Sequence, residues 1–305
     1  ERHGGFEKYR SVKVGLFQKL SRKKDGIGVY NLDDRNVEYF LKPKVARKIG
    51  FTLRDNFQFS IFNFQSIFNV TNIQLQTDGC EFNIEGTHFQ MPLVGEFNVY
   101  NAVAAIAAAQ ALGVSLEKCA EVLRNPTRVS GRLEIAQRDP FAVIVDYAHE
   151  PRSLEEAYKA ARLFQDTRHK EQDTKKSKMI CLLGSQGGGR DRWKRAEMGK
   201  IAAKYCDEIV LTNEDPYDEK PISIIEDIEI GLINNQDTRN NPNVWKVIDR
   251  KEAIRKALSL AGAGDVVILT GKGGEVWMVL ERGRRIPWDE TQIVRDILNE
   301  NGGHV

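Results

Sequence analysis

The sequence predicts an α/β protein: a mixed sheet with helices, followed by a doubly wound α/β domain. Residues 37–92 alternate apolar and polar side chains over short stretches, which is typical of strands in a mixed or antiparallel sheet. Beyond residue 131, short apolar runs alternate with helical patterns, as in repeated βα units. Segment 124–131 between them contains Pro, Ser and Gly, so we predict two domains, 1–130 and 131–305.

The first domain opens with a predicted helix over 6–20. One stripe of this helix carries Phe6, Tyr9, Leu16, Phe17 and Leu20. Residues 26–34 are expected to form a short strand that runs into a turn. A second helix is predicted over the Ala-rich run 98–112, with Asn98 as its cap, and a third from Ser115 to Leu123.

The second domain is predicted from alternating strands and helices with short connections. We expect strands over 142–146, 179–183, 208–211, 244–248 and 265–270, and helices over 152–165, 192–205, 222–234, 251–261 and 290–300. Residues 166–178 are polar and are expected to form a mobile loop. Ligands of such domains bind beyond the carboxyl ends of the strands, which is where the motifs below lie.

Composition excludes several classes of protein. The 305 residues include 45 Lys and Arg against 43 Asp and Glu, so the net charge of +2 gives no broad attraction to nucleic acid or to a membrane. The sequence has no apolar run of about 18 residues and no signal peptide, and we expect a cytoplasmic protein. The four cysteines are far apart, which predicts reduced, mostly buried thiols. Because the chain begins Glu1-Arg2-His3, we expect a piece of a longer protein.

Residues 184–195 (GSQGGGRDRWKR) connect a predicted strand to a helix. Glycines let backbone N–H groups approach an anion, and the sequence adds four cations, Arg190, Arg192, Lys194 and Arg195. An anion or carboxylate site is favoured over a flexible turn with a solvated basic helix start. The loop is no Walker A motif, because no Gly-Lys-Ser/Thr follows, and 271–275 (GKGGE) fails the same test.

Two further motifs follow predicted strands. In 146–151 (DYAHEP), Asp146 is placed to accept ribose hydroxyls and His149 to contact a phosphate, although the segment equally suits a helix start at Pro151. Residues 212–219 (TNEDPYDE) crowd four carboxylates, which indicates either a solvated acidic turn or recognition of an amine or a metal.

Lys13 lies in the middle of the apolar stripe of the first helix. A partly desolvated lysine favours its neutral amine, which reacts with carbon dioxide to give a metal-binding carbamate. The alternative is a lysine that extends to water.

Together these segments resemble the Mur ligase family of ATP-dependent amide ligases, and within it the MurE type, which adds the third amino acid of the peptidoglycan stem peptide. The resemblance covers nearly the whole chain in collinear order. Its matching segments are His3-Gly4 with Tyr9 and Lys13, then 31–34, 95–101, 131–134, 146–151, 190–195, 214–217 and 271–275. It implies the remainder of a central, ATP-binding domain followed by a Rossmann-like C-terminal domain that binds the amino acid.

The resemblance also implies roles for single residues. Lys13 would be a carbamate that helps to hold Mg. The nucleotide would contact Asn98, Asn101, Arg132, Asp146 and His149. The incoming amino acid would lie among Arg190, Glu214, Asp215, Tyr217, Gly271 and Glu275. The substrates would be ATP, UDP-N-acetylmuramoyl-dipeptide and an amino acid, joined through an acyl phosphate, in an enzyme expected to be a monomer at full length.

This sequence departs from the family pattern in ways that affect function. The P-loop lysine, the catalytic glutamate, the metal-binding histidine and the UDP-binding domain would all lie before Glu1, so we expect no ligase activity from this chain alone. Tyr217 stands where ligases of the diaminopimelate type carry an Arg, and the extra carboxylate favours a basic amino acid such as lysine. The alternatives are another ligase of the superfamily, of the cyanophycin or folylpolyglutamate type, or a non-catalytic binding module.

Overall fold

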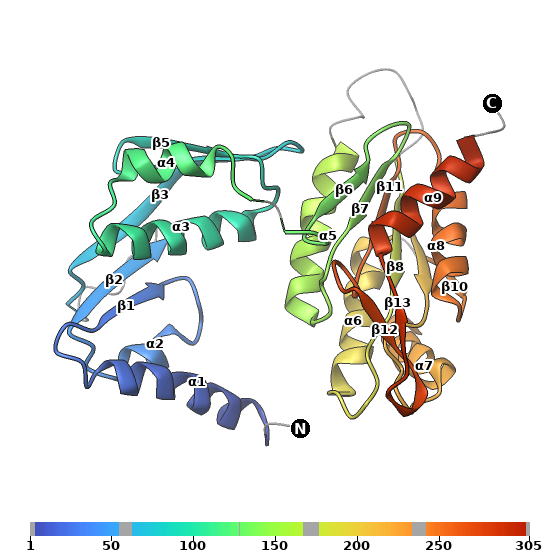
Figure 1. Cartoon of the computed structure of the whole chain (residues 1–305), viewed down its shortest axis with the longest axis horizontal. Helices are drawn as coiled ribbons and strands as arrows, with labels where there is room; N and C mark the ends of the chain where they lie inside the picture. The colour runs from blue at the N-terminus through green and yellow to red at the C-terminus, as the bar shows by residue number, and fades with distance from the viewer. Residues whose placement is uncertain (1–3, 55–62, 128, 167–176, 234–241, 303–305) are drawn as a thin grey trace. The chain divides into compact units, whose positions relative to one another are not determined.

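The computed structural model describes residues 4–54, 63–127, 129–166, 177–233 and 242–302. These form two compact units, Glu1–Thr127 and Arg128–Val305 (Figure 1). The unit boundary lies three residues before the domain boundary that the sequence predicts. Among the described residues, no helix is long and apolar enough to cross a membrane.

Unit 1 is built on a mixed five-stranded sheet in the order β1-β2-β3-β4-β5. Its strands are β1 (Ile27–Asn31), β2 (Arg47–Thr52), β3 (Ser66–Leu75), β4 (Cys80–Ile84) and β5 (Thr87–Met91). The first three are parallel, and β3, β4 and β5 continue as an antiparallel meander. The mixed sheet predicted for 37–92 is therefore confirmed, although the sequence did not reveal the short helix α2 (Val37–Leu41) within it.

Helix α3 (Glu96–Ala111) covers this sheet. Val103 and Ile106 of α3 belong to the same buried core as Phe82 and Phe89, whose rings stack with centroids 5.1 Å apart. The helix begins two residues before the predicted start, at an N-cap formed by Gly95, so the prediction that Asn98 caps it is wrong. Helix α4 (Leu116–Leu123) is as predicted, because the Ser115 side chain accepts the Lys118 N–H.

Unit 2 contains a six-stranded sheet in the order β10-β9-β8-β11-β7-β6. Its strands are β6 (Glu134–Gln137), β7 (Ala142–Val145), β8 (Met179–Leu183), β9 (Glu208–Leu211), β10 (Asn243–Lys246) and β11 (Val266–Leu269). All neighbours pair in parallel except β6, which is antiparallel to β7. Strands β7, β8, β9 and β11 are buried throughout, as expected for parallel strands covered on both faces.

Two groups of helices cover this sheet. They are α5 (Pro151–Asp166), α6 (Trp193–Tyr205) and α7 (Pro221–Ile233), and α8 (Arg250–Ser259) with α9 (Glu290–Gly302) (Figure 1). The chain steps from β7 through β8 and β9 to β10 in one direction, then returns through α8 to β11. Right-handed crossovers in opposite directions place their helices on opposite faces, which confirms the doubly wound domain. A hairpin of β12 (Trp277–Val279) and β13 (Arg285–Pro287), joined through η2 (Glu281–Gly283), follows β11.

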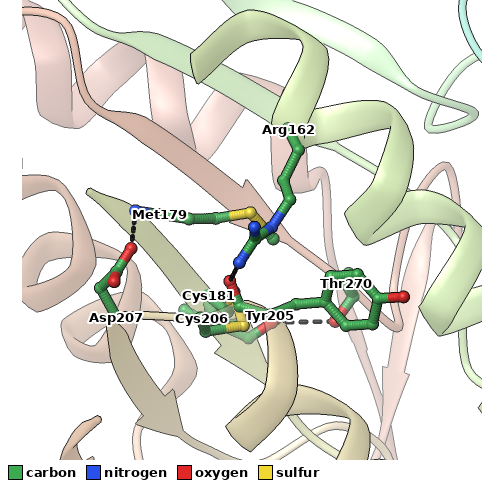
Figure 2. Close-up of a disulfide and its surroundings, with 8 residues drawn as sticks. Arg162, Met179, Cys181, Tyr205, Cys206, Asp207 and Thr270 are labelled. Carbon is green, nitrogen blue, oxygen red and sulfur yellow. Dashed lines mark hydrogen bonds between the residues drawn. A yellow bond between two sulfur atoms is a disulfide. The ribbon is translucent and has the colours of Figure 1, made fainter. Parts of the chain in front are cut away.

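A disulfide joins Cys181 of β8 to Cys206, the residue that follows α6 (Figure 2). Both residues are fully buried, and their Cα atoms lie 6.0 Å apart. The guanidinium of Arg162 donates to the carbonyl of Tyr205, and the amide of Met179 donates to the carboxylate of Asp207 (Figure 2). The prediction of four reduced cysteines is therefore wrong for this pair, because α6 returns Cys206 to the strand that holds Cys181. Cys80 and Cys119 are free and buried.

Candidate functional site

Three loops meet at the carboxyl ends of β8, β9 and β11 in unit 2. They are residues 184–190, 212–217 and 270–275, all of which the sequence singled out. The amide of Gly187 donates to the carbonyl of Asp215 over 2.8 Å, which joins the first two loops. A Cβ at Gly271 would collide with the carboxylate of Glu214, which places the third loop against the second. The site therefore lies where the winding of the sheet reverses, the usual ligand position in such domains.

Glu214 is the most unusual side chain of this site. It is completely buried, and neither carboxylate oxygen has a hydrogen-bond partner among the described residues. Burial raises the pKa of this carboxyl to about 7, the neighbouring charge of Asp215 adds to the rise, and the charges of Arg250 and Lys272 oppose it. A buried acceptor without a donor is costly, so this position suits a ligand that brings a donor.

Two other buried acceptors at the same strand ends also lack partners in the described part of the chain. They are Oγ of Ser185, in the loop after β8, and Oδ1 of Asn213, which directly precedes Glu214. Gly184 brings the two loops together, since a Cβ there would lie 3.1 Å from Cβ of Glu214. The arrangement offers oxygen acceptors to a small donor such as an ammonium group.

Lys272 neutralises the other carboxylates of the site. Its fully buried Nζ donates to Asp215 over 2.9 Å, to Glu275 over 2.6 Å and to the carbonyl of Trp277 over 2.7 Å. The three donors of the ammonium group are thereby used. Of the carboxylates assigned here from sequence, Asp215 and Glu275 are ion-paired, whereas Glu214 has no ion pair among the described residues.

Glu275 also connects the site to the motifs at 131–134 and 146–151. Its other carboxylate oxygen accepts the hydroxyl of Tyr147 over 2.9 Å, and the guanidinium of Arg132 lies 4.4 Å from the centroid of the Tyr147 ring. Burial and the Glu275 carboxylate raise the pKa of Tyr147 to about 12. Gly131, at φ +66°, approaches the backbone of Gly274 so closely that a Cβ would collide with it.

Asp146 and His149 hold the turn that follows β7. The two carboxylate oxygens of Asp146 accept the amides of Leu133 and Ala148, each over 2.8 Å. Burial raises the pKa of Asp146, although these amides and the charge of Arg132 oppose the rise. Nδ1 of His149 lies 2.8 Å from the carbonyl of Tyr147. These bonds give both residues a structural role, and their assignment to a nucleotide stays a prediction.

The glycine-rich loop carries less available positive charge than the sequence suggested. Arg192 pairs with Asp227, and the buried Lys194 donates to the carbonyl of His149 and to the carboxylate of Glu150. Arg195, also buried, binds Glu219, Asp227 and the carbonyl of Gln186. The expectation that four cations of this loop form an anion site is therefore wrong for Arg192, Lys194 and Arg195. In the described part of the chain, the exposed guanidinium of Arg190 is the one of the four without an ion pair.

Tyr217 closes the loop after β9 against the glycine-rich loop. Its backbone is in the left-handed region at φ +51°, which is uncommon for an aromatic residue. The ring lies against Gly188, where a Cβ would approach it to 2.7 Å. A tyrosine thus fills the position at which the family pattern places a carboxylate-binding arginine.

The other predicted site residues lie in unit 1. Asn98 donates to the carbonyl of Val94 over 2.8 Å, and Asn101 donates to the side chain of Asn98 over 3.4 Å, so the two lie together at the start of α3. Their contact with a nucleotide stays a prediction.

Lys13 is exposed on α1 (Phe6–Leu20), a helix without a buried residue, and its Nζ lies 5.4 Å from the centroid of the Tyr9 ring. The expectation that Lys13 is desolvated is therefore wrong, and its carbamylation stays a prediction. No group of three His, Cys, Asp or Glu that would hold a metal ion occurs among the described residues, and His3 lies outside them.

Sequence reasoning overlooked the residues that arrange the site. Lys272 was noted only within a segment that fails the Walker A test, and Arg250, which lies one residue before the predicted helix over 251–261, was assigned no role. Both are fully buried, and the carboxylates of Asp215 and Glu290 that they bind lie 57 and 40 residues away in the sequence. Ser185 stood inside the glycine-rich motif without a role of its own.

Comparison with protein families shows two matches. Residues 1–109 match the Mur ligase middle domain, and residues 131–273 match the glutamate ligase domain of Mur ligases. A solved structure of a UDP-N-acetylmuramoyl-L-alanyl-D-glutamate–2,6-diaminopimelate ligase superposes with a TM-score of 0.55 at 26% identity. That alignment covers 98% of this chain and 58% of the other.

Relatives of known name agree with these matches. A UDP-N-acetylmuramoyl-L-alanyl-D-glutamate–2,6-diaminopimelate ligase of Aquifex aeolicus is 35% identical over 98% of this chain. A UDP-N-acetylmuramyl-tripeptide synthetase of Borreliella burgdorferi is 34% identical over 98% of this chain. The chain spans 56% of the first relative and 55% of the second. On these two domain matches, collinear and together spanning most of its length, the chain belongs to the Mur ligase family.

Proposed function

We propose that this chain is part of an ATP-dependent ligase that joins a basic amino acid to UDP-N-acetylmuramoyl-dipeptide. The observation that carries the choice of amino acid is Glu214, a buried carboxyl with two unpartnered oxygens at the ligand edge of the sheet. The relatives support the reaction class. The Aquifex relative is named for diaminopimelate, whereas the name of the Borreliella relative specifies no amino acid.

The proposed reaction has two steps. The γ-phosphate of ATP passes to the carboxylate of the dipeptide to form an acyl phosphate, and the amine of the incoming amino acid then displaces phosphate. Within this scheme the loops of unit 2 bind and orient the amino acid, which lowers the entropic cost of the second step. The exposed guanidinium of Arg190, which has no ion pair among the described residues, would bind the α-carboxylate of that amino acid. ATP and Mg are the proposed cofactors, and the candidate nucleotide contacts remain Asn98, Asn101, Arg132, Asp146 and His149.

Local charge favours a basic side chain over a zwitterionic one. Lys272 is already bonded to Asp215 and Glu275, so it has no donor left for the distal carboxylate of diaminopimelate. Tyr217 offers a hydroxyl where an arginine would form a bidentate pair. An ammonium group beside Glu214 would instead satisfy acceptors that are otherwise unpartnered.

Calorimetry on the 305-residue chain with L-lysine, L-ornithine, meso-diaminopimelate and L-norleucine tests this proposal. We expect lysine or ornithine to bind at least about tenfold more tightly than the other two, since a charge-assisted hydrogen bond contributes roughly 1.5–3 kcal/mol. Glu214→Gln should remove this preference. The matched variant Glu197→Gln, at a half-buried glutamate of α6 that pairs with Lys200, should retain it. Tighter binding of meso-diaminopimelate would refute the choice of amino acid.

A further inference from the structure

Arg250 joins the two loops that enclose Glu214. Its fully buried guanidinium donates through Nη1 to the carbonyl of Asn213 over 3.1 Å, and through Nη2 to the carbonyl of Thr270 over 2.8 Å. Asn213 directly precedes Glu214, and Thr270 directly precedes Gly271. One side chain at the start of α8 thus fixes the spacing of the loops after β9 and β11.

Glu290 at the start of α9 fixes the guanidinium itself. Its carboxylate, also buried, accepts Nε over 3.1 Å and Nη2 over 2.6 Å, and it accepts the indole N–H of Trp288 over 2.6 Å. Such a bidentate pair sets the orientation of both partners. Hydrogen bonds occupy the two edges of the guanidinium, and no described hydrogen bond joins Arg250 to Glu214.

The charges that face Glu214 come from several elements. They are Arg250 of α8, Asp215 beside it, Lys272 after β11, Lys194 of α6, and Tyr147 after β7. Lys272 is bonded to two carboxylates and Lys194 to a third. Arg250 is therefore the positive charge that stabilises the ionised Glu214 carboxylate most, although the carboxylate of Glu290 partly neutralises it.

We propose that Arg250 is a positioning residue of the amino-acid site, which holds the Glu214 carboxylate and the Gly271 loop at the spacing that a ligand ammonium group requires. The identity of that ligand rests on the proposed function, whereas the placement of Glu214 by Arg250 is independent of it. A second consequence is electrostatic: the positive charge of Arg250 favours the ionised carboxylate, so its removal should make Glu214 harder to ionise.

The decisive experiment follows the side-chain carboxyl carbon of Glu214 by 13C NMR through a pH titration of the 305-residue chain, with Glu214→Gln to assign the signal. Arg250→Met should raise the pKa of Glu214 above the wild-type value. In Arg250→Lys, which retains the positive charge, this pKa should return most of the way to the wild-type value. Arg295→Met is the matched control, because Arg295 contacts Glu134 on the exposed side of α9 and should leave the titration unchanged. Lysine binding at pH 7 should weaken about tenfold in Arg250→Met and by an intermediate factor in Arg250→Lys.

Glu290→Gln tests the same idea in the opposite direction. It removes the carboxylate that shares the charge of Arg250, so the pKa of Glu214 should fall. This variant decides the question if Arg250→Met lacks the native near-ultraviolet circular dichroism spectrum. An unchanged titration in folded Arg250→Met, or a rise in Glu290→Gln, would overturn the inference. Shifted titrations without lysine binding to the wild type would leave it standing and would remove the proposed choice of amino acid.

Discussion

Glu214 places a fully buried carboxyl group where no donor among the described residues satisfies it. Groups of this kind cluster at functional sites, because a ligand supplies the missing partner. Without that ligand the ionised form is costly inside the fold. The same residue that is proposed to select the substrate should therefore weaken the unliganded protein as it ionises.

This cost gives stability a defined pH dependence. Glu214 titrates near 4.5 when exposed and near 7 in the folded chain, so between these values the folded state binds the additional proton. The free energy of unfolding should fall as pH rises from about 4.5 to 7, by about 3 kcal/mol at most. Urea unfolding at pH 5 and pH 7.5 measures it. Glu214→Gln should reduce this fall, whereas Glu197→Gln should not. An equal change in the free energy of unfolding between the two pH values in wild type and Glu214→Gln would contradict the assignment of the pH dependence to Glu214.

At the scale of single residues the sequence predicted the place of the site better than its chemistry. Strand ends and glycines located the loops, because parallel strands direct their carboxyl ends to one edge. Which carboxylates are neutralised depends on Lys272 and Arg250. Their partners Asp215 and Glu290 are distant in sequence, whereas Glu275, the second carboxylate bound by Lys272, is only three residues away. The same holds for the glycine-rich loop, where Asp227, Glu150 and Glu219 bind the cations that the pattern assigned to an anion. Apart from the pair of Lys272 with Glu275, no local pattern contains these pairings.

Close backbone approach holds the loops of unit 2 together. Gly131 combines φ +66° with a position against the backbone of Gly274, whereas Gly264 has φ +85° and open space around it. Gly264→Ala should destabilise the chain by about 1–2 kcal/mol through its backbone conformation alone. Gly131→Ala should cost roughly 1–3 kcal/mol more, because the new methyl group collides with the second loop. Thermal unfolding of the pair checks this, and equal losses would show that the two loops separate freely.

The elements that sequence patterns predicted well have clear periodicity or a capping residue. Helix α1 spans the predicted 6–20, and β8 and β9 match their predicted ranges. Strand β6 and the hairpin β12–β13 were not predicted, because they are short and mostly half-buried or exposed, without strict alternation. The loop predicted over 166–178 lies largely outside the described residues. Asn98 shows the limit of cap rules, since Gly95 offered an earlier start.

Each unit has its own hydrophobic core. In unit 1 a buried core lies between the sheet and helices α3 and α4, and in unit 2 a buried core joins β7, β8, β9 and β11 to helices α8 and α9. All four tryptophans, Trp193, Trp245, Trp277 and Trp288, belong to unit 2. Tryptophan fluorescence therefore reports the unfolding of unit 2, whereas far-ultraviolet circular dichroism reports both units.

This asymmetry allows the disulfide to be tested. Replacement of Cys181 and Cys206 by Ala opens a loop with a sequence separation of 25 and should cost about 3 kcal/mol. The midpoint of the fluorescence transition should move to lower urea, while the part of the dichroism signal that belongs to unit 1 stays in place. Paired replacement of the free Cys80 and Cys119 by Ala is the control. It should shift the part of the dichroism signal that belongs to unit 1 and leave the fluorescence transition in place. A shift of both signals by the same amount in either variant would indicate that the units unfold as one.

The Cys181–Cys206 bond also makes a covalent ring out of the segment it spans. That ring contains the entire glycine-rich loop, with the exposed Arg190 and Arg192 at its outer side. A protease that cuts the backbone after either arginine would open the ring without releasing a fragment. The nicked chain would then migrate as one species on a non-reducing gel and as two after treatment with a thiol. A cut in this loop, which borders the proposed amino-acid site, would therefore break the backbone while the disulfide still held the two pieces together as one molecule.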